Sequence, residues 1–211
     1  MRVLVACEFS GVVRDAFAER GHDAWSCDLL PTERPGQHIQ GDLREVRVED
    51  FDLMIAHPPC TYLTNAGVRH LHSIPSRNGT ITKIHGAERW ALMVEAAEFF
   101  NLIRRAPVLR IAVENPIPHR YARERIGYYD QLVQPWMFGH GETKATCFRL
   151  RNLKPLERTH RKNDLFALPE PEERRGRVHH TSPSPDRWKI RSATYPGLAA
   201  AMADQWGRAE A

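Results

Sequence analysis

The sequence predicts a single α/β domain with a largely parallel sheet, because short apolar runs alternate along the chain with segments of helical periodicity. Mostly apolar runs of this kind are typical of strands buried on both faces, and they occur at 3–7, 24–27, 52–57 and 109–113. Each run ends at a polar or proline-rich turn. The length of 211 residues and the 42% share of hydrophobic residues suit one domain with its own core.

Helices are expected between and after these strands. Residues 11–21 place their apolar side chains on one side of a helix, and Gly21 is its expected stop. Residues 86–104 form the longest predicted helix, because large apolar residues recur there at helical spacing. A last helix, at 196–207, carries an apolar stripe that we expect to pack back on the core.

The stretch 151–195 differs from the rest of the chain. It is rich in proline, arginine, histidine and glutamate, so we expect an irregular basic segment or lid that follows an α/β core of residues 1–150. The net charge is +4, and lysine and arginine crowd into residues 144–191. A positive balance of this kind suits a phosphate-bearing partner.

Several classes of protein do not fit this sequence. No apolar run approaches the roughly 18 residues of a membrane span, and the N-terminus starts directly with a strand pattern, so we expect a cytoplasmic protein without a membrane partner. Four widely spaced cysteines, without a CxxC pair, predict neither a disulfide framework nor a bound metal; they are Cys7, Cys27, Cys60 and Cys147.

Two polar segments follow the first two predicted strands, and ligands of open α/β sheets bind at the carboxyl ends of strands. In the first segment, residues 7–11, Gly11 would let the backbone approach a ligand, and the next helix N-terminus favours a carboxylate or phosphate. In the second, Asp28 is placed to accept hydrogen bonds from both hydroxyls of a ribose. The pair is a candidate site for a nucleotide-like cofactor.

Two further strands end in residues that can carry chemistry. Two prolines precede Cys60 and would stiffen a loop that holds its sulfur in place. Glu114 closes a buried strand directly before Asn115-Pro116, where a carboxylate is costly unless a partner meets it. The plainer interpretations remain open at this point, namely that Cys60 is a small buried residue and that Glu114 is a solvated strand end.

Taken in order, these segments resemble the motif series of the cytosine-C5 methyltransferases. The series comprises Phe9-x-Gly11, an acid closing the second strand, Pro59-Cys60 and Glu114-Asn115-Pro116. Supporting matches are Gly41-Asp42-Leu43-Arg44, the turn and strand at 141–150, and Tyr195-Pro196-Gly197-Leu198-Ala199. The chain looks like a compact, phage-type member that lacks a target recognition domain.

The resemblance implies a Rossmann-like class I fold, S-adenosylmethionine as cofactor, and a role for each matching residue. The implied cofactor-binding residues are Phe9, Ser10, Gly11, Asp28, Asp42 and Pro58. The Cys60 thiolate would add to carbon 6 of cytosine, so that carbon 5 can attack the methyl sulfonium, while Glu114 protonates or hydrogen-bonds ring N3. The candidate substrate-binding residues are Pro59, Asn115, Lys144, Thr146, Arg187, Lys189 and Arg191.

The sequence departs from the family pattern at two places. His57 and Pro58 replace the usual small residues before Pro-Cys. The Gln-x-Arg-x-Arg positions read Glu142-x-Lys144-x-Thr146, so Lys144 is the remaining candidate for contact with the cytosine O2.

The length of one segment indicates which molecule accepts the methyl group. The stretch 151–195 is too short for the separate domain with which resembling enzymes read base edges in duplex DNA. A free cytosine nucleotide is narrowly favoured, because it needs no flipping out of a duplex. The alternatives are single-stranded or loosely read DNA, a degenerate fold that serves as a binding module, and amino-group methylation, in which Pro58-Pro59 would belong to an Asp/Asn-Pro-Pro-aromatic signature.

Overall fold

The computed structural model describes residues 1–72, 85–159, 174–184 and 186–208. The predicted irregular segment therefore lies partly outside the described residues, at 160–173 and 185.

The described residues form a seven-stranded sheet with the strand order β3-β2-β1-β4-β5-β7-β6. Its strands are β1 (Arg2–Ala6), β2 (Asp23–Asp28), β3 (His38–Gln40), β4 (Leu53–Ala56), β5 (Arg110–Asn115), β6 (Gln131–Val133) and β7 (Thr146–Arg151). The strands from β3 to β5 run parallel to one another, whereas β7 is antiparallel to both of its neighbours, β5 and β6. The predicted α/β fold with a mostly parallel sheet is confirmed.

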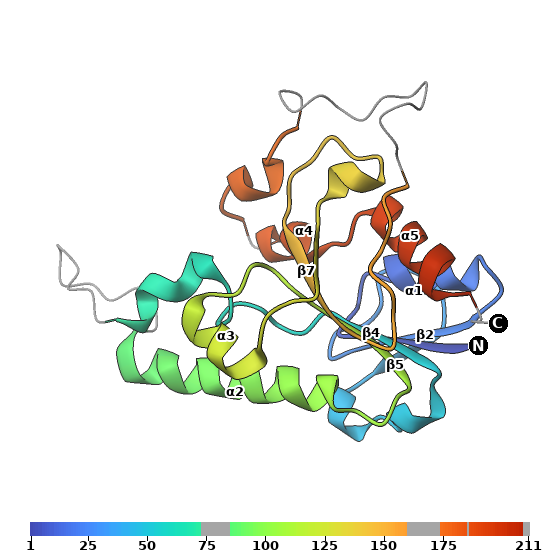
Figure 1. Cartoon of the computed structure of the whole chain (residues 1–211), viewed down its shortest axis with the longest axis horizontal. Coiled ribbons are helices and arrows are strands. Elements are labelled where there is room, and N and C mark those ends of the chain that lie inside the picture. The colour runs from blue at the N-terminus through green and yellow to red at the C-terminus, as the bar shows by residue number, and fades with distance from the viewer. Residues whose placement is uncertain (73–84, 160–173, 185, 209–211) are drawn as a thin grey trace.

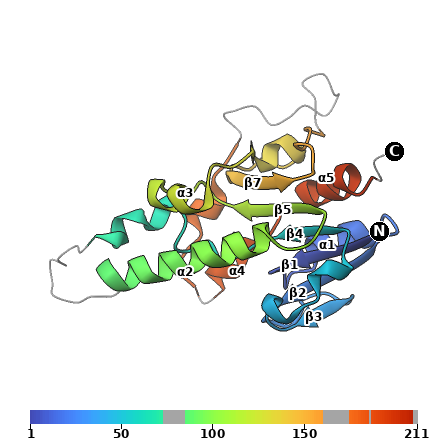
Figure 2. The ribbon, with the colours of Figure 1, turned by 60° about the horizontal axis from the view of Figure 1, so that its bottom comes forward.

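Helices cover both faces of the sheet (Figures 1 and 2). They are α1 (Val12–Ala18), α2 (Gly86–Arg104), α3 (Arg120–Ile126), α4 (Arg187–Ser192) and α5 (Pro196–Trp206). On one face α1 packs against α5, and on the other α2 packs against α3. The chain therefore has three layers, with the sheet in the middle.

Alternate residues of the central strands supply the two halves of the core. Val3 and Val5 of β1 belong to the cluster under α1 and α5, whereas Leu4 and Ala6 belong to the cluster under α2 and α3. All four are fully buried. Burial on both faces explains why these strands read as continuous apolar runs instead of alternating ones.

Several boundaries differ from the sequence-based expectation. The first helix ends at Ala18, three residues before Gly21, and β5 continues through Glu114 to Asn115. The stretch expected to be irregular contains the helix α4, which is too short to produce a clear periodic pattern. The strands β3 and β6 have three residues each and were missed for the same reason.

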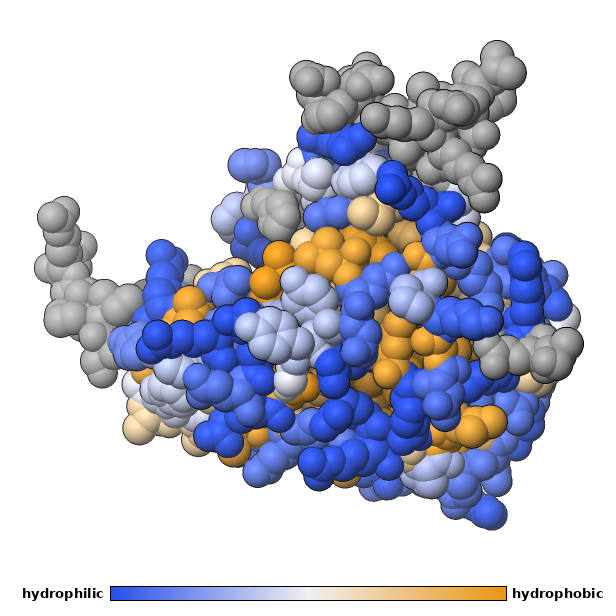
Figure 3. Space-filling model, in the orientation of Figure 1, coloured by the Kyte–Doolittle hydropathy of each residue, from blue (hydrophilic) through white to orange (hydrophobic). Residues whose placement is uncertain are grey.

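The surface mixes apolar and hydrophilic side chains. On the face of Figure 1, hydrophobic side chains gather over and around β7 and hydrophilic ones surround them (Figure 3). None of the described helices combines the length and the hydropathy that a bilayer crossing requires.

Candidate active site at the carboxyl edge of the sheet

The turn between β1 and α1 is built around the carboxylate of Glu8. This buried side chain accepts hydrogen bonds from the backbone N–H groups of Val13 (2.7 Å) and Arg14 (3.2 Å), and from the Ser10 hydroxyl (3.2 Å). The first turn of α1 therefore already has an anionic partner from within the chain. The expectation that this helix N-terminus is free to bind a ligand carboxylate is therefore wrong for the N–H groups of Val13 and Arg14, which already donate to Glu8.

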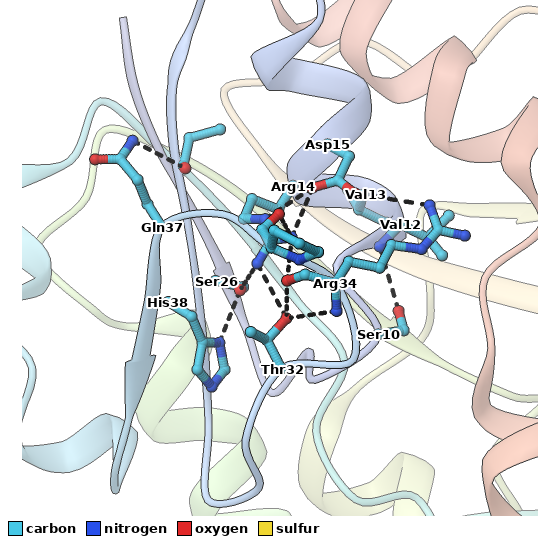
Figure 4. A network of polar contacts seen from close by, with 12 residues as sticks. Ser10, Val12, Val13, Arg14, Asp15, Ser26, Thr32, Arg34, Gln37 and His38 are labelled. Carbon is cyan, nitrogen blue, oxygen red and sulfur yellow. Dashed lines mark hydrogen bonds and ion pairs between the residues drawn. The ribbon is translucent and has the colours of Figure 1, made fainter.

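Gly11 permits a close approach, but the group that approaches is a side chain of the protein. Gly11 has φ 71°, and a Cβ there would lie 2.5 Å from the guanidinium of Arg14. Arg14 is 1% exposed and donates to Asp15 Oδ1 (2.7 Å), Ser26 Oγ (3.2 Å) and the carbonyl of Pro35 (3.0 Å) (Figure 4). A buried guanidinium thus ties α1 to the loop after β2. The sequence gives no signal for this role of Arg14, which lies within an ordinary helical pattern.

Asp28 and Asp42 lie together at the carboxyl edge of the sheet. Asp28 ends β2, and its carbonyl accepts the N–H of Gly41 at 2.9 Å. Burial, together with the charges of Asp28 and Asp42, raises the pKa of the nearby Cys7 thiol to about 12. Each carboxylate also caps a local turn, since Asp28 Oδ1 accepts from Leu30 N (3.0 Å) and Asp42 Oδ1 accepts from Arg44 N (2.9 Å). Two acids therefore meet beside the end of β1.

Helix α4 contacts the turn after β1. The Trp188 and Phe9 rings are 5.4 Å apart, and Lys189 Nζ lies 6.0 Å from the Phe9 ring and 3.4 Å from Glu33 Oε1. Lys189, expected among the acceptor-binding residues, therefore lies on the Phe9 side. Arg187, from the same group, donates through Nε to the carbonyl of Thr181 (2.7 Å).

Cys60, Glu114, Lys144 and Arg191 form one electrostatically coupled group. Burial raises the pKa of the Cys60 thiol to about 11, and the charge of Glu114 raises it too, whereas Lys144 and Arg191 lower it. Burial lowers the pKa of Lys144, and the charges of Glu114 and Cys60 oppose that shift. Lys144 Nζ donates to the carbonyl of Ala193 (3.0 Å), just after α4. The group joins residues from the loop after β4, from β5, from the turn before β7 and from α4.

The neighbouring candidates are placed around this group. Asn115 is 3% exposed, and its Oδ1 is buried without a hydrogen-bond partner among the described residues. Pro58 is buried and Pro59 is exposed. Thr146 begins β7 and donates its hydroxyl to the carbonyl of Lys144 (3.2 Å). Glu142 stands where the family pattern has its glutamine. It forms an ion pair with Arg177, which accounts for a carboxylate at this position.

Two residues that the sequence analysis did not single out brace the loop that carries Cys60. Arg89 of α2 donates to the carbonyl of Thr61 (3.2 Å), and its guanidinium lies 5.0 Å from the Tyr62 ring centroid. His119 Nε2 lies 2.9 Å from the carbonyl of Tyr62. Both are buried polar residues on elements distant in sequence, so no local pattern marks them.

The described part of the chain contains no group of three or more His, Cys, Asp or Glu side chains that could hold a metal ion. Its four cysteines are free thiols.

The order of the strands, with the antiparallel β7 inserted between β5 and β6, is that of the Rossmann-like methyltransferase fold. Solved structures similar to this chain include the following two. One is a prophage-encoded E. coli protein assigned as a DNA modification methyltransferase, with 14% identity, a TM-score of 0.43, and coverage of 71% of this chain and 46% of that one. The other is the Entamoeba histolytica methyltransferase EhMeth, with 13% identity, a TM-score of 0.45, and coverage of 76% of this chain and 55% of that one.

This chain spans about half the length of both structures. No protein-family model matches the chain, and no curated protein matches it.

Proposed function

We propose that this protein transfers a methyl group from S-adenosylmethionine to carbon 5 of cytosine through a covalent bond to Cys60. The observation that carries the proposal is the coupled group of Cys60, Glu114 and Lys144, which lies at the same sheet edge as Asp28 and Asp42. A thiol, a carboxyl group and a cation at one edge match the requirements of this reaction.

The cofactor would occupy the edge formed by β1, β2 and β3, where it supplies an electrophilic methyl group. Asp28 would accept from the ribose hydroxyls, Asp42 would meet the adenine, and the Phe9 ring and Pro58 would provide apolar contact. The methionine part would lie near Ser10 and Gly11, without using the N–H groups that Glu8 already engages. The two neighbouring acids fit a ligand that carries several hydroxyl and amino donors.

Cys60 and Glu114 would divide the chemistry of the base. The Cys60 sulfur adds to carbon 6 while Glu114 donates a proton or a strong hydrogen bond to ring N3, which makes carbon 5 nucleophilic. Burial and the charge of Glu114 raise the pKa of the thiol to about 11, and the charges of Lys144 and Arg191 oppose this rise, so the two cations favour the thiolate over the thiol. Once carbon 5 has taken the methyl group from S-adenosylmethionine, a base, for which water is a sufficient candidate, removes the carbon 5 proton, and the thiolate leaves carbon 6.

We favour a free cytosine nucleotide as the acceptor. Lys144, Pro59, Asn115 and Thr146 would contact the base, and the side chains of Arg187 and Arg191 would bind phosphate. Lys189 faces Glu33 instead, so we assign the phosphate contacts to the two arginines. DNA remains the second candidate, because the Trp188 side chain is half exposed beside these basic residues, as in proteins that stack single-stranded bases.

Calorimetry tests the cofactor assignment. S-adenosylmethionine should bind, and Asp28→Ala should weaken binding by about 2–4 kcal/mol, because two hydrogen bonds to a charged group are lost. Asp52→Ala, at the opposite edge of the sheet, is the matched control and should bind as the wild type does. No heat of binding, or equal binding by Asp28→Ala, contradicts the assignment.

Mass spectrometry of the products tests the acceptor. Incubation with labelled S-adenosylmethionine and dCMP, dCTP, CMP or cytosine-rich oligonucleotides should label a mononucleotide at carbon 5. Arg191→Ala should reduce that labelling, since a charge-assisted hydrogen bond contributes about 1.5–3 kcal/mol. Methylation of oligonucleotides alone, weakening steeply with salt, would replace the nucleotide by DNA, and methylation at the exocyclic amine would overturn the carbon 5 assignment.

A further inference from the structure

His57 and Glu114 are neighbours because their strands are neighbours. Ala56 of β4 pairs in register with Val113 of β5, and the next residue on each strand is His57 and Glu114. His57 Nδ1 lies 3.8 Å from Glu114 Oε2, and the two side chains are 14% and 16% exposed. The resembling enzymes usually have a small residue in place of this histidine, so the family pattern does not account for the pair.

The imidazole has a second feature. His57 Nε2 is buried and has no hydrogen-bond partner among the described residues, although the backbone N–H of His57 is fixed to the carbonyl of Ala6 (2.9 Å). An unpaired buried polar atom destabilises a fold. A purely structural residue at this position would not need a titratable ring.

We propose that His57 is a positioning residue whose Nδ1 shares a proton with the carboxyl group of Glu114, so that Glu114 can act as an acid at neutral pH. This inference rests on the proposed function. In the pair, one proton is shared between Nδ1 of His57 and Oε2 of Glu114. The ring orients the carboxyl group, and it supplies the shared proton to Glu114 when Glu114 donates to the base.

The proton and electron movements balance. As the Cys60 thiolate forms a bond to carbon 6, the C5=C6 π pair moves to C4–C5, and the C4=N3 π pair forms the N3–H bond with the proton of Glu114. This proton is the one shared by the pair, so its loss leaves Glu114 as a carboxylate beside a neutral His57. When the thiolate later leaves carbon 6, N3 returns its proton to Glu114, and the proton shared by the pair is restored.

The distance and the surrounding charges are compatible with this relay. A separation of 3.8 Å exceeds a hydrogen bond of about 2.7–3.2 Å, so the side chains must close on substrate binding, as catalytic contacts commonly do. The titratable and charged groups around the pair are Cys60, Lys144, Cys147 and Arg191. The cations stabilise a carboxylate and disfavour an imidazolium, whereas a carboxylate favours an imidazolium, so the neighbouring charges act on the pair in opposite directions.

The test is the pH dependence of kcat/KM for the wild type, His57→Gln and His57→Asn on a cytosine acceptor. A lone carboxylic acid ordinarily loses its proton near pH 4.3 and an imidazolium near about pH 6.5. Removing the imidazole should therefore move the alkaline limb of the profile at least one unit lower, with a loss of tenfold or more at pH 8 that becomes smaller as the pH falls toward 4. His22→Gln, at the amino edge of the sheet, is the control and should not shift the limb.

A fall by the same factor at every pH, or an unshifted limb in both variants, overturns the role of His57. Trapping of Cys60 by a 5-fluorocytosine acceptor separates the two proposals. If the wild type is trapped and the variants keep the wild-type limb, only the inference about His57 fails. If the wild type is not trapped at any pH, the proposed function fails and the inference falls with it.

Discussion

At the scale of single residues, the environment of a cysteine decides whether it can serve as a nucleophile. Cys60 and Cys147 both lie near Glu114, and burial raises the pKa of both, to about 11 and about 12. Only for Cys60 do Lys144 and Arg191 oppose the increase. This difference in cationic neighbours, and not burial itself, separates the proposed nucleophile from the structural thiol.

The raised pKa of Cys147 makes folding depend on alkaline pH. A thiol whose folded-state pKa lies above its unfolded value contributes stability below the unfolded pKa, near 9, and that stability is lost as the pH rises toward about 12. The free energy of unfolding should therefore fall above pH 9, and Cys147→Ala should show a shallower fall. Urea denaturation at pH 7, 9 and 10 measures both slopes, and parallel slopes would contradict the assignment.

At the scale of elements, the Arg14 guanidinium is the main polar connection between α1 and the loop after β2. Arg14→Met keeps most of the apolar stem but leaves Asp15 and the carbonyls of Arg34 and Pro35 without their donor, so we expect a loss of about 2–4 kcal/mol in the free energy of unfolding. Arg47→Met removes an exposed arginine that pairs with Glu49, and it should change stability by less than about 1 kcal/mol. Equal effects of the two substitutions in urea unfolding would show that burial of Arg14 contributes little.

Helix α4 should influence cofactor binding through its contact with Phe9. Trp188→Ala removes the ring that packs on Phe9, and we expect about a tenfold increase in the Kd for S-adenosylmethionine, equivalent to about 1.4 kcal/mol. Ile190→Ala is the matched control, since Ile190 is an exposed apolar residue of the same helix. If both variants bind the cofactor equally well, α4 does not contribute to the cofactor site.

The sequence predicts the buried strands and the long helices, because their signals are local. The apolar runs of β1, β4 and β5 and the spacing in α2 mark those elements directly. The roles of Arg14, Arg89 and His119 depend on partners distant in the chain, and no local pattern reports them. For His57 the sequence shows only part of the role. The histidine in place of the usual small residue is visible in the sequence, but its proximity to Glu114 follows only from the register of the sheet.

At the scale of the whole molecule, the sheet brings two sets of residues to one edge. Parallel strands from β3 to β5 place the ends of β1 and β2, with Asp28, beside the ends of β4 and β5, with Cys60 and Glu114. The right order of strands thus joins a candidate cofactor site to a candidate nucleophile. Helix α4 lies close to the two sites. Its Trp188 ring packs on Phe9 beside the candidate cofactor site, and the charge of its Arg191 acts on Cys60.

The most direct test of this account is covalent trapping at Cys60. The protein is incubated with S-adenosylmethionine and a 5-fluorocytosine nucleotide or oligonucleotide, then digested and analysed by peptide mass spectrometry. The account predicts a stable adduct on the peptide that contains Cys60, absent from Cys60→Ser and unchanged in Cys27→Ser, because fluorine blocks the final elimination. Methyl transfer to cytosine without such an adduct, or near-normal turnover by Cys60→Ser, would contradict it.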